Sequence, residues 1–371
     1  METEIRNILD SINEINPYAT YLNNNTLSTV SDWIDTGSYV LNSIISGSLH
    51  KGIPKGRVTL FAGESMTGKS LFVQRILANA QKQGLFPVIF DTEGAIDPVG
   101  AARLGLDIEN VKYVPCTTIE QTRNAIYKLL NTIHENKMYG KFIVAIDSLG
   151  NLQSALDYSR MEKEGEGADM GSRARAIKSL MQTCTNLGLI TQTTFIITNH
   201  VYDNPGEMYP SIEKNMPGGK SVAYLPSVTV QLARKPIKED AKIDNSKTAV
   251  MQKNYGGIII RALTRKNRFI KQYIEGEMYL SFSTGLDRYY GLIELAVGLG
   301  VVVQTGSTYS LEDGTKLGYA KKWRNNTELW EKTILPQVES RILKEWSYSN
   351  SESVDSILDD IENIEDETEN E

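Results

Sequence analysis

The stretch VTLFAGESMTGKS, residues 58–70, decides the fold. An apolar run at residues 58–62 is followed by GESMTGKS, which fits the pattern G-x-x-x-x-G-K-[ST] of a phosphate-binding loop between a strand and a helix. Glycines let such a backbone wrap around phosphates, while the lysine reaches the β and γ phosphates and the hydroxyl binds Mg²⁺. The sequence therefore predicts a site for a nucleoside triphosphate and Mg²⁺, formed by Gly63, Glu64, Ser65, Met66, Thr67, Gly68, Lys69 and Ser70.

Alternating strands and helices are predicted from about residue 33 to residue 286. Strands are expected at residues 57–62, 86–91, 141–147, 194–199, 227–233 and 257–263. Helical periodicity lies between them, as at residues 119–133 and 171–187. Apolar strands separated by helices indicate a largely parallel sheet covered on both faces, and ligands of such sheets bind at the carboxyl ends of the strands.

Three smaller parts flank this core, which is expected to span residues 31–286. Residues 1–30 carry an apolar stripe at helical spacing, formed by Ile5, Ile8, Leu9, Ile12 and Ile15. This helix either folds back on its own core or docks on a neighbouring subunit. Residues 287–346 are expected to form a small α+β domain, and residues 347–371 an acidic, disordered tail.

The net charge is unevenly distributed. The chain of 371 residues carries −7, and residues 351–371 hold ten acidic residues and no basic one, so the first 350 residues carry +3. Most acidic tails are simply solvated. An acidic tail on a body that binds a polyanion can also act as an internal competitor.

Composition also excludes several classes of protein. No stretch reaches the roughly 18 uninterrupted apolar residues of a membrane helix, and the first residues lack a basic region followed by an apolar one. We therefore expect a cytoplasmic protein without a membrane partner. Cys116 and Cys184 are far apart and lack CxxC spacing, which favours buried thiols over disulfides or zinc ligands.

Two carboxylates at strand ends complete the predicted triphosphate site. The apolar run at residues 142–146 ends in Asp147, which we expect to hold the water shell of Mg²⁺. Ser148 follows, so the glutamate that commonly activates water at that position is absent. Glu93 lies just beyond the strand at residues 86–91, beside the expected γ-phosphate, and is predicted to be the base. A solvated loop carboxylate is the alternative.

A third strand end carries His200 and a long polar segment, residues 201–219. A lone histidine is more often structural, but this one follows a buried strand and opens a loop of a length that is usually functional or mobile. The large side chains expected to be exposed there, and able to stack on or wedge between bases, are Tyr202, Met208, Tyr209 and Met216.

A shorter irregular stretch is expected at residues 157–169, after the strand of Asp147. It leads into a helix start with Arg173, Arg175 and Lys178, which could hold backbone phosphates. A solvated helical face explains these charges equally well. Because both loops follow neighbouring strands, they are expected to face the same side of the domain and to share a ligand.

Together these motifs resemble the RecA-type homologous recombinases, and most closely the UvsX recombinases of tailed phages. The resemblance runs from about residue 33 to residue 323. FDTEGAIDPVGAARLGLD (residues 90–107) is similar to the adenine and catalytic-glutamate segment of the bacterial family, while AIDSLGNL (residues 145–152) and Asn199-His200 match the phage branch. The resemblance implies an α/β, RecA-like P-loop ATPase core with a mostly parallel sheet, an N-terminal helix and a small C-terminal α+β domain.

The resemblance also implies roles for matching positions. Glu93 would position the attacking water, Asp97 would contact the adenine amino group, and His200 would sense the γ-phosphate at the base of the second DNA-binding loop. Residues 157–169 would be the first such loop and residues 201–219 the second. The candidate DNA-binding residues are Met170 as a wedge between base triplets, Arg173, Arg175, Tyr202, Tyr209, Gly218, Gly219 and Lys220.

Outside these loops, two further positions match the family and one departs from it. In TRKNR (residues 264–268), Lys266 and Arg268 would enter the nucleotide site of the neighbouring subunit, whereas charge alone suggests a solvated hairpin tip. Gly100 departs from the family, because bacterial relatives stack an aromatic side chain on the adenine there. Base selectivity and nucleotide affinity therefore do not follow from the resemblance.

The expected activity is ATP-dependent DNA strand exchange by a homo-oligomeric filament on single-stranded DNA, with ATP and Mg²⁺ held between subunits. Partners implied are homologous duplex DNA, a recombination mediator and a single-strand-binding protein. Two alternatives stay open: a hexameric helicase of the same fold, and an ATP-gated regulatory assembly whose loops bind protein instead of DNA.

Overall fold

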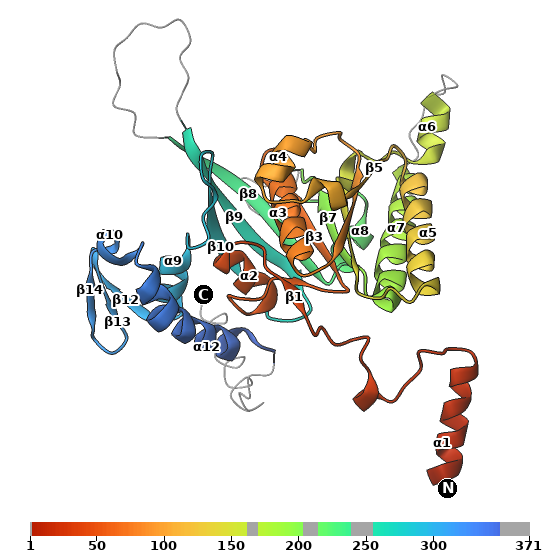
Figure 1. The fold of residues 1–371 in the computed structure, drawn as a ribbon, viewed down its shortest axis with the longest axis horizontal. Coiled ribbons are helices and arrows are strands. Elements are labelled where there is room, and N and C mark those ends of the chain that lie inside the picture. The colour runs from red at the N-terminus through yellow and green to blue at the C-terminus, as the bar shows by residue number, and fades with distance from the viewer. Residues whose placement is uncertain (1, 162–169, 203–213, 239–254, 349–371) are drawn as a thin grey trace, which may run out of the picture.

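The central feature of the computed structural model is one large sheet, seen nearly edge-on in Figure 1. The structure describes residues 2–161, 170–202, 214–238 and 255–348. The strands of the sheet in these ranges are β3 (Val58–Gly63), β4 (Phe86–Asp91), β5 (Lys112–Pro115), β6 (Phe142–Asp147), β7 (Thr194–Asn199), β8 (Val228–Lys238), β9 (Tyr255–Asn267), β10 (Glu275–Ser281) and β11 (Gly285–Leu286). Their order across the sheet is β11-β10-β9-β8-β3-β7-β6-β4-β5.

The sheet is parallel from β8 to β5 and antiparallel from β9 to β11. The mostly parallel sheet predicted from the sequence is thus confirmed, and every predicted strand is present. β8 and β9 are longer than expected because they pair with each other as a ribbon beyond the body of the sheet. β5, β10 and β11 were not predicted.

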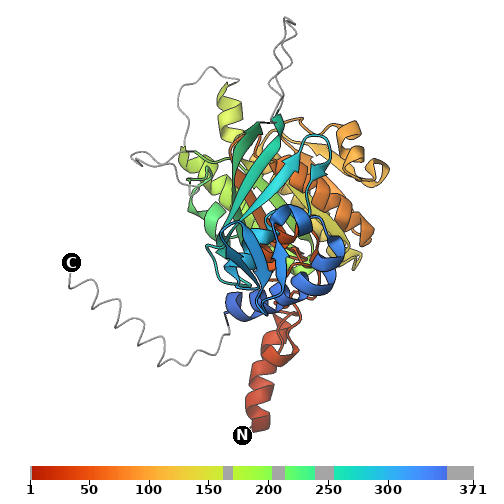
Figure 2. The ribbon, with the colours of Figure 1, turned by 90° about the vertical axis from the view of Figure 1, so that its left-hand side faces the viewer.

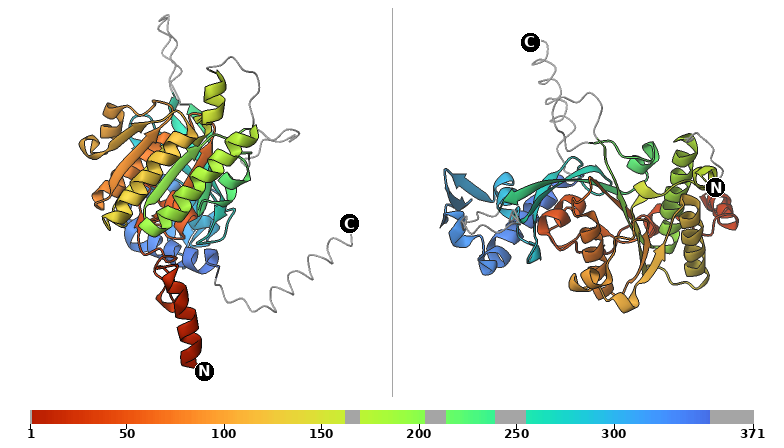
Figure 3. Two further views of the ribbon diagram at one scale, coloured as in Figure 1. Left: turned by 90° about the vertical axis from the view of Figure 1, so that its right-hand side faces the viewer. Right: turned by 90° about the horizontal axis from the view of Figure 1, so that it is seen from above.

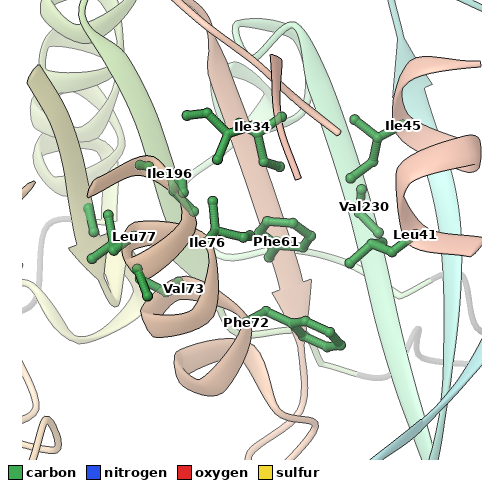
Figure 4. Close-up of a cluster of buried hydrophobic side chains, with 14 of the residues drawn as sticks. Ile34, Leu41, Ile45, Phe61, Phe72, Val73, Ile76, Leu77, Ile196 and Val230 are labelled. Atoms are coloured by element: carbon green, nitrogen blue, oxygen red, sulfur yellow. The ribbon is translucent and has the colours of Figure 1, made fainter. Parts of the chain in front are cut away.

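Helices cover both faces of the sheet (Figures 1 and 3). One face is covered by α2 (Tyr39–Ser46), α3 (Lys69–Lys82) and α4 (Pro98–Arg103), the other by α5 (Ile119–Glu135), α7 (Met170–Thr191) and α8 (Lys220–Tyr224). Phe61 of β3 packs with Phe72 of α3 on the first face (Figure 4), whereas the preceding residue, Leu60, belongs to the core of the second. This alternation is why the strands read as continuous apolar runs.

A small C-terminal unit packs beside the antiparallel edge of the sheet, as Figure 1 shows. Its elements are α9 (Leu292–Gly298), β12 (Val302–Thr305), β13 (Thr308–Leu311), β14 (Lys316–Gly318), α10 (Ala320–Trp323), α11 (Thr327–Leu329), a π-helical turn (Trp330–Ile334) and α12 (Leu335–Trp346). Trp323 and Trp330 lie at the centre of its own apolar core. The predicted small α+β domain is therefore confirmed.

The N-terminal helix does not fold back on the core. α1 (Glu2–Asp10) and the following 3₁₀ turn (Ser11–Glu14) project from the body (Figures 1 and 2). The apolar stripe is exposed within the described part of the chain: Ile8 is 70% and Ile15 91% accessible. Tyr18, in the connector, contacts His134 at the end of α5 through its hydroxyl, 3.3 Å from Nδ1.

The remaining short elements are a second 3₁₀ turn (Leu22–Asn24), the paired strands β1 (Trp33–Ile34) and β2 (Ile53–Pro54), further 3₁₀ turns at Ile108–Asn110 and Leu149–Asn151, and α6 (Ala155–Met161). α6 corrects the prediction of an irregular stretch at residues 157–169, because residues 157–161 are helical. Ser154 caps this helix, accepting from the Asp157 amide at 3.1 Å. Both cysteines are buried free thiols, as expected. Within the described ranges, no helix combines the length and apolar character needed to cross a bilayer.

Candidate nucleotide site and strand-end loops

The phosphate-loop motif folds as a tight connection between β3 and α3. A Cβ on Gly63 would lie 2.7 Å from Thr67 Oγ1 and 2.8 Å from the Leu232 carbonyl oxygen, so only glycine fits. Gly68 has a φ of +86°, in the left-handed region that favours glycine. The loop therefore ends at the amino terminus of α3, where unpaired backbone N–H groups favour a bound anion.

Lys69 and its partners occupy the inside of this loop. Its Nζ donates to the carbonyl oxygens of Gly63, at 2.8 Å, and Glu64, at 2.7 Å. Burial lowers the pKa of this ammonium, and the carboxylates of Asp147 and Glu93 act in the opposite direction. The geometry holds a buried positive charge at the point where phosphate oxygens would meet the loop.

Asp147, at the end of β6, fits the predicted role in holding Mg²⁺. Its Oδ1 accepts from the Thr198 hydroxyl at 2.5 Å, while its Oδ2 is buried without a hydrogen-bond partner among the described residues. Burial raises the pKa of Asp147, and the hydrogen bond from Thr198 opposes that rise. Mg²⁺ typically takes one or two protein ligands together with water and phosphate oxygens, so Ser70 and this orphaned oxygen form a suitable donor set.

The Glu93 segment is built onto Asp147 through the pairing of two strands. β4 and β6 are parallel neighbours, with Asp91 directly opposite Asp147. Asp91 Oδ1 accepts from the backbone N–H groups of Glu93 and Gly94, each at 2.9 Å, which turns the chain after β4. Thr92 Oγ1 accepts from the Ser148 amide at 3.0 Å. Local hydrogen bonds thus fix where Glu93 leaves the sheet.

The Glu93 carboxylate is held by two donors on one oxygen. Oε1 accepts from Ser148 Oγ at 2.7 Å and lies 3.1 Å from His200 Nε2, which must be the donor because a carboxylate only accepts. Ser148 is completely buried. The structure therefore brings Glu93, His200 and Asp147 together, as predicted, and adds Ser148 and Thr198, which sequence reasoning missed. In the sequence, only their positions at the ends of β6 and β7 point to a role for these two residues.

His200 also touches the segment that follows β6. A Cβ on Gly150 would lie 2.9 Å from His200 Cδ2, so the ring packs directly on this glycine. Arg173, predicted as a phosphate contact, donates instead to the Gly150 carbonyl oxygen at 2.6 Å and to that of Leu152 at 3.1 Å. In this structure Arg173 clamps the segment after β6 to α7.

The two ends of the second predicted loop lie against one another and against α7. Tyr202 and Asn215 exchange backbone hydrogen bonds of 3.0 and 3.1 Å. Asn199 Nδ2 donates to the Pro217 carbonyl oxygen at 3.0 Å. Gly218 has a φ of +106°, and a Cβ on it would lie 2.7 Å from Val222 Cγ2.

These contacts place both loop stems on the same side of the domain, as predicted. A Cβ on Gly219 would touch that of Ala174 in α7, at 3.6 Å. Arg175, Lys178 and Lys220 are exposed nearby, and Tyr202 is 52% accessible. Met170 begins α7. Tyr209 and residues 162–169 lie outside the described residues, so their predicted DNA contacts stay predictions.

Asp97 and Glu64 have partners of their own. Asp97 caps α4, accepting from the Gly100 amide at 2.7 Å, so the adenine contact implied for it stays a prediction. Glu64 forms an ion pair with Lys214, at the end of the second loop. The Lys214 carbonyl oxygen accepts from Gln231 Nε2 at 2.9 Å, which connects the phosphate loop to β8.

Lys266 and Arg268 lie at the opposite edge of the sheet from the phosphate loop. Lys266 belongs to β9 and pairs with Thr229, which pairs with Leu60 of β3, three residues before Gly63. Arg268 follows the last residue of β9 and is exposed at the start of the connection to β10, as charge alone suggests, whereas Lys266 lies within β9 and is half-buried. Lys266 Nζ donates to the Tyr224 carbonyl oxygen, and burial, then the charge of Arg268, lowers the pKa of Lys266 to about 8.

Comparison with known proteins agrees with this arrangement. The family model "RecA N-terminal domain" matches residues 18–286. Protein RecA of Thermus aquaticus is 27% identical over 315 residues, which cover 84% of this chain and 85% of that protein. Protein RecA of Aquifex aeolicus is 27% identical over 289 residues, which cover 78% and 76%. The family match includes β3 to β11 and every strand-end residue described above. The chain belongs to the RecA family.

Proposed function

We propose that the protein is an ATP-dependent DNA strand-exchange recombinase that forms helical filaments on single-stranded DNA. It would act in homologous recombination, recombination-dependent replication and repair. The observation that carries the proposal is the contact of His200 with both the Glu93 carboxylate and the segment after β6, since it connects a candidate hydrolytic centre to two loop stems. Similarity to bacterial Protein RecA supports it.

The residues at the carboxyl ends of the parallel strands, which we call the carboxyl edge of the sheet, would perform the hydrolytic step. Loop amides and Lys69 hold the phosphate chain, and Glu93, fixed by Ser148, orients a water towards the γ-phosphate. Ser70 and Asp147 would hold Mg²⁺, which when bound would offset the negative charge of the triphosphate. Asp97 would contact the adenine from the start of α4, where Gly100 leaves the base without an aromatic partner.

The other half of the site would come from the next subunit. Lys266 and Arg268 act as arginine fingers on the γ-phosphate of the neighbour, so that hydrolysis depends on assembly. The register of β3, β8 and β9 supports this, because both side chains lie at the amino edge of the sheet, away from their own phosphate loop. The exposed stripe of α1 would dock on that neighbouring subunit.

DNA would bind across the two loop stems. Met170 wedges between base triplets, Arg175, Gly218, Gly219 and Lys220 hold the backbone, and Tyr202 and Tyr209 stack on bases. Arg173 supports this surface indirectly, through its bonds to the segment after β6. His200 links the γ-phosphate to residues 201–219, so that triphosphate orders the loop and hydrolysis releases it.

Within the family, we assign the chain to the phage UvsX branch. AIDSLGNL at residues 145–152 and the Asn199-His200 pair support this assignment. It implies action in the cytoplasm of a bacterial host, with a recombination mediator and a single-strand-binding protein as partners. A hexameric helicase and an ATP-gated assembly without DNA binding are the competing functions.

The test is a paired measurement on the full chain. We expect single-stranded DNA to stimulate ATP hydrolysis and the mixture to pair that DNA with a homologous duplex in preference to an unrelated one. ATP-driven unwinding by closed rings would favour the helicase. Hydrolysis that ignores DNA, with no filaments on single strands, would favour the regulatory assembly.

A further inference from the structure

The amino edge of the sheet carries a cluster of cations around a cavity. Arg57, just before β3, and Arg268, just after β9, both line a cavity of about 430 Å³. Arg57 is half-buried, and burial, then the charge of Arg268, lowers its pKa. Lys266 lies two residues before Arg268, and the charge of Arg268 acts on it too. We call Arg57, Lys266 and Arg268 the amino-edge cations.

The amino-edge cations have no carboxylate partner among the described residues. None of the three belongs to an ion pair. Arg57 donates only to carbonyl oxygens, at 2.9 Å to Gly56 and 2.7 Å to Leu27, and Lys266 to that of Tyr224. The guanidinium of Arg268 makes no hydrogen bond within the described ranges. Two of these cations, Arg57 and Lys266, are half-buried, and gathering like charges there is unfavourable unless an anion offsets them.

The last described residues are attached directly beside these cations. The backbone N–H of Lys271 donates to the Trp346 carbonyl oxygen, at the end of α12, at 2.9 Å. Beyond the helix, the Tyr348 hydroxyl donates to the Asn267 carbonyl oxygen, also at 2.9 Å. Asn267 lies between Lys266 and Arg268 in the chain. The acidic segment that follows therefore starts at the amino edge.

The short distance that the chain after Tyr348 must span favours docking of the acidic segment at the amino edge over docking at the DNA-binding side. The first carboxylate, Glu352, follows Tyr348 by four residues, which span at most about 14 Å when extended. The predicted DNA loops follow the carboxyl ends of β6 and β7, and the length of a six-residue strand such as β3 alone separates the two edges by roughly 20 Å. Effective concentration falls with the span that a tether must cover.

The composition of residues 351–371 matches the cavity. Ten carboxylates in this segment are interspersed with the apolar residues Val354, Ile357, Leu358, Ile361 and Ile364. The cavity offers donors for carboxylates in its two guanidinium groups, Asn186 and Ser227. Its apolar walls are formed by Val58, Leu189, Leu225 and Phe269.

We propose that the acidic segment, residues 351–371, docks on the amino-edge cations of its own chain. It occupies the surface that, on the function proposed above, must receive the nucleotide of the neighbouring subunit. The tail thus restrains filament assembly by competing for the subunit interface, and not by competing with DNA at the loops. During assembly, the triphosphate of the neighbouring subunit replaces the tail carboxylates on the same three side chains.

The test is carbodiimide cross-linking of the full chain, diluted below assembly and without nucleotide or DNA. Carbodiimide joins lysine amines to carboxylates, and the lowered pKa of Lys266 makes its amine reactive. We expect amide links from Lys266 to tail carboxylates, identified by mass spectrometry. Mixing isotope-labelled and unlabelled chains shows whether each link is within one chain.

Arg268→Ala provides the matched variant, because that side chain has no partner to lose within the described structure. It should lower the yield of Lys266-to-tail links several-fold, as should a rise in salt from 0.05 to about 0.5 M, since exposed charges are then screened. Links from the tail mainly to Lys178 and Lys220 would overturn the proposal in favour of the DNA-binding side. Absence of links within one chain would also overturn it.

A second measurement separates this proposal from the proposed function. Neutralising the tail with Glu352→Gln and Asp355→Asn should strengthen nucleotide-dependent self-association without DNA, measured by light scattering. If self-association is unchanged, docking does not compete with assembly and the proposal fails. Cross-linking requires neither hydrolysis nor DNA, so a failure of strand exchange leaves that result interpretable.

Discussion

The two edges of the central sheet have opposite electrostatic character. At the carboxyl edge, the carboxylates of Glu93 and Asp147 act on one buried ammonium, that of Lys69. These carboxylates and that of Asp91 accept hydrogen bonds from hydroxyls, backbone amides and His200. At the amino edge, Arg57 and Arg268 line a cavity, Lys266 lies two residues before Arg268, and none of the three has an ion-pair partner in the described chain. One edge holds the groups that we propose position a water, and the other holds excess positive charge.

On the proposed function, this difference means that neither edge by itself supplies all the groups for triphosphate hydrolysis. A transferring phosphoryl group needs both an oriented nucleophile and cations that offset the charge on its oxygens. The strand register keeps the two edges of one chain apart, so on the proposed function two copies would meet head to tail. Three predictions test this comparison, two at the amino edge and one at the carboxyl edge.

Lys266→Ala should have the largest effect, because it removes a cation from the amino edge without touching the water-positioning groups. We expect DNA-stimulated ATP hydrolysis to fall about 10³- to 10⁵-fold, as when an arginine finger is lost. Binding of a fluorescent ATP analogue by the dilute single subunit should stay within a few-fold of wild type. Lys271→Ala, a matched change on the same edge, should hydrolyse normally, and normal turnover by Lys266→Ala would contradict the comparison.

Ser148→Ala tests the carboxyl edge. Loss of a hydrogen bond to a charged group costs about 1.5–3 kcal/mol, so turnover should fall roughly 10- to 100-fold with KM little changed. Ser148→Cys, whose thiol is a weaker donor, should have a turnover between those of the wild type and Ser148→Ala. Turnover of Ser148→Ala equal to that of the wild type would mean that Ser148 serves only packing.

The lowered pKa of Lys266 predicts a smaller, pH-dependent effect. In the isolated subunit its positive charge is present below about pH 8 and is lost as pH rises through that value. Nucleotide-dependent assembly should therefore weaken a few-fold from pH 7 to pH 9, measured by light scattering. Lys266→Arg keeps its charge and should remove most of this dependence. If assembly of the wild type depends on pH as little as assembly of Lys266→Arg, then Lys266 is not the source of a pH dependence.

Sequence patterns predicted the strands, the phosphate loop and the positions of Asp147, Glu93 and His200 because each follows from local periodicity or from a strand end. Partnerships across strands were not predictable in this way. In the sequence, Ser148 stands out only because it is not glutamate. Its hydrogen bond to Glu93 depends on the pairing of β4 with β6. Thr198 reaches Asp147 for a similar reason, across β7.

Other differences also have physical causes. Arg173 and Arg175 look alike in the sequence, but a helix turns them to different sides, and Arg173 contacts the segment after β6. β5 and β10 lack continuous apolar runs because they lie towards the margins of the sheet, where few side chains are buried. The cluster of Arg57 with Arg268 joins residues more than two hundred positions apart, which no local pattern reveals.

The most direct test mixes two inactive variants. Glu93→Gln supplies the amino-edge cations but cannot orient the water, whereas Lys266→Ala keeps its own carboxyl edge. In an equal mixture on single-stranded DNA, about a quarter of the head-to-tail interfaces should combine an intact Glu93 with an intact Lys266. We predict that ATP hydrolysis returns to about a quarter of the wild-type rate per subunit. A mixture as inactive as its two components would contradict the claim that the site is shared between copies.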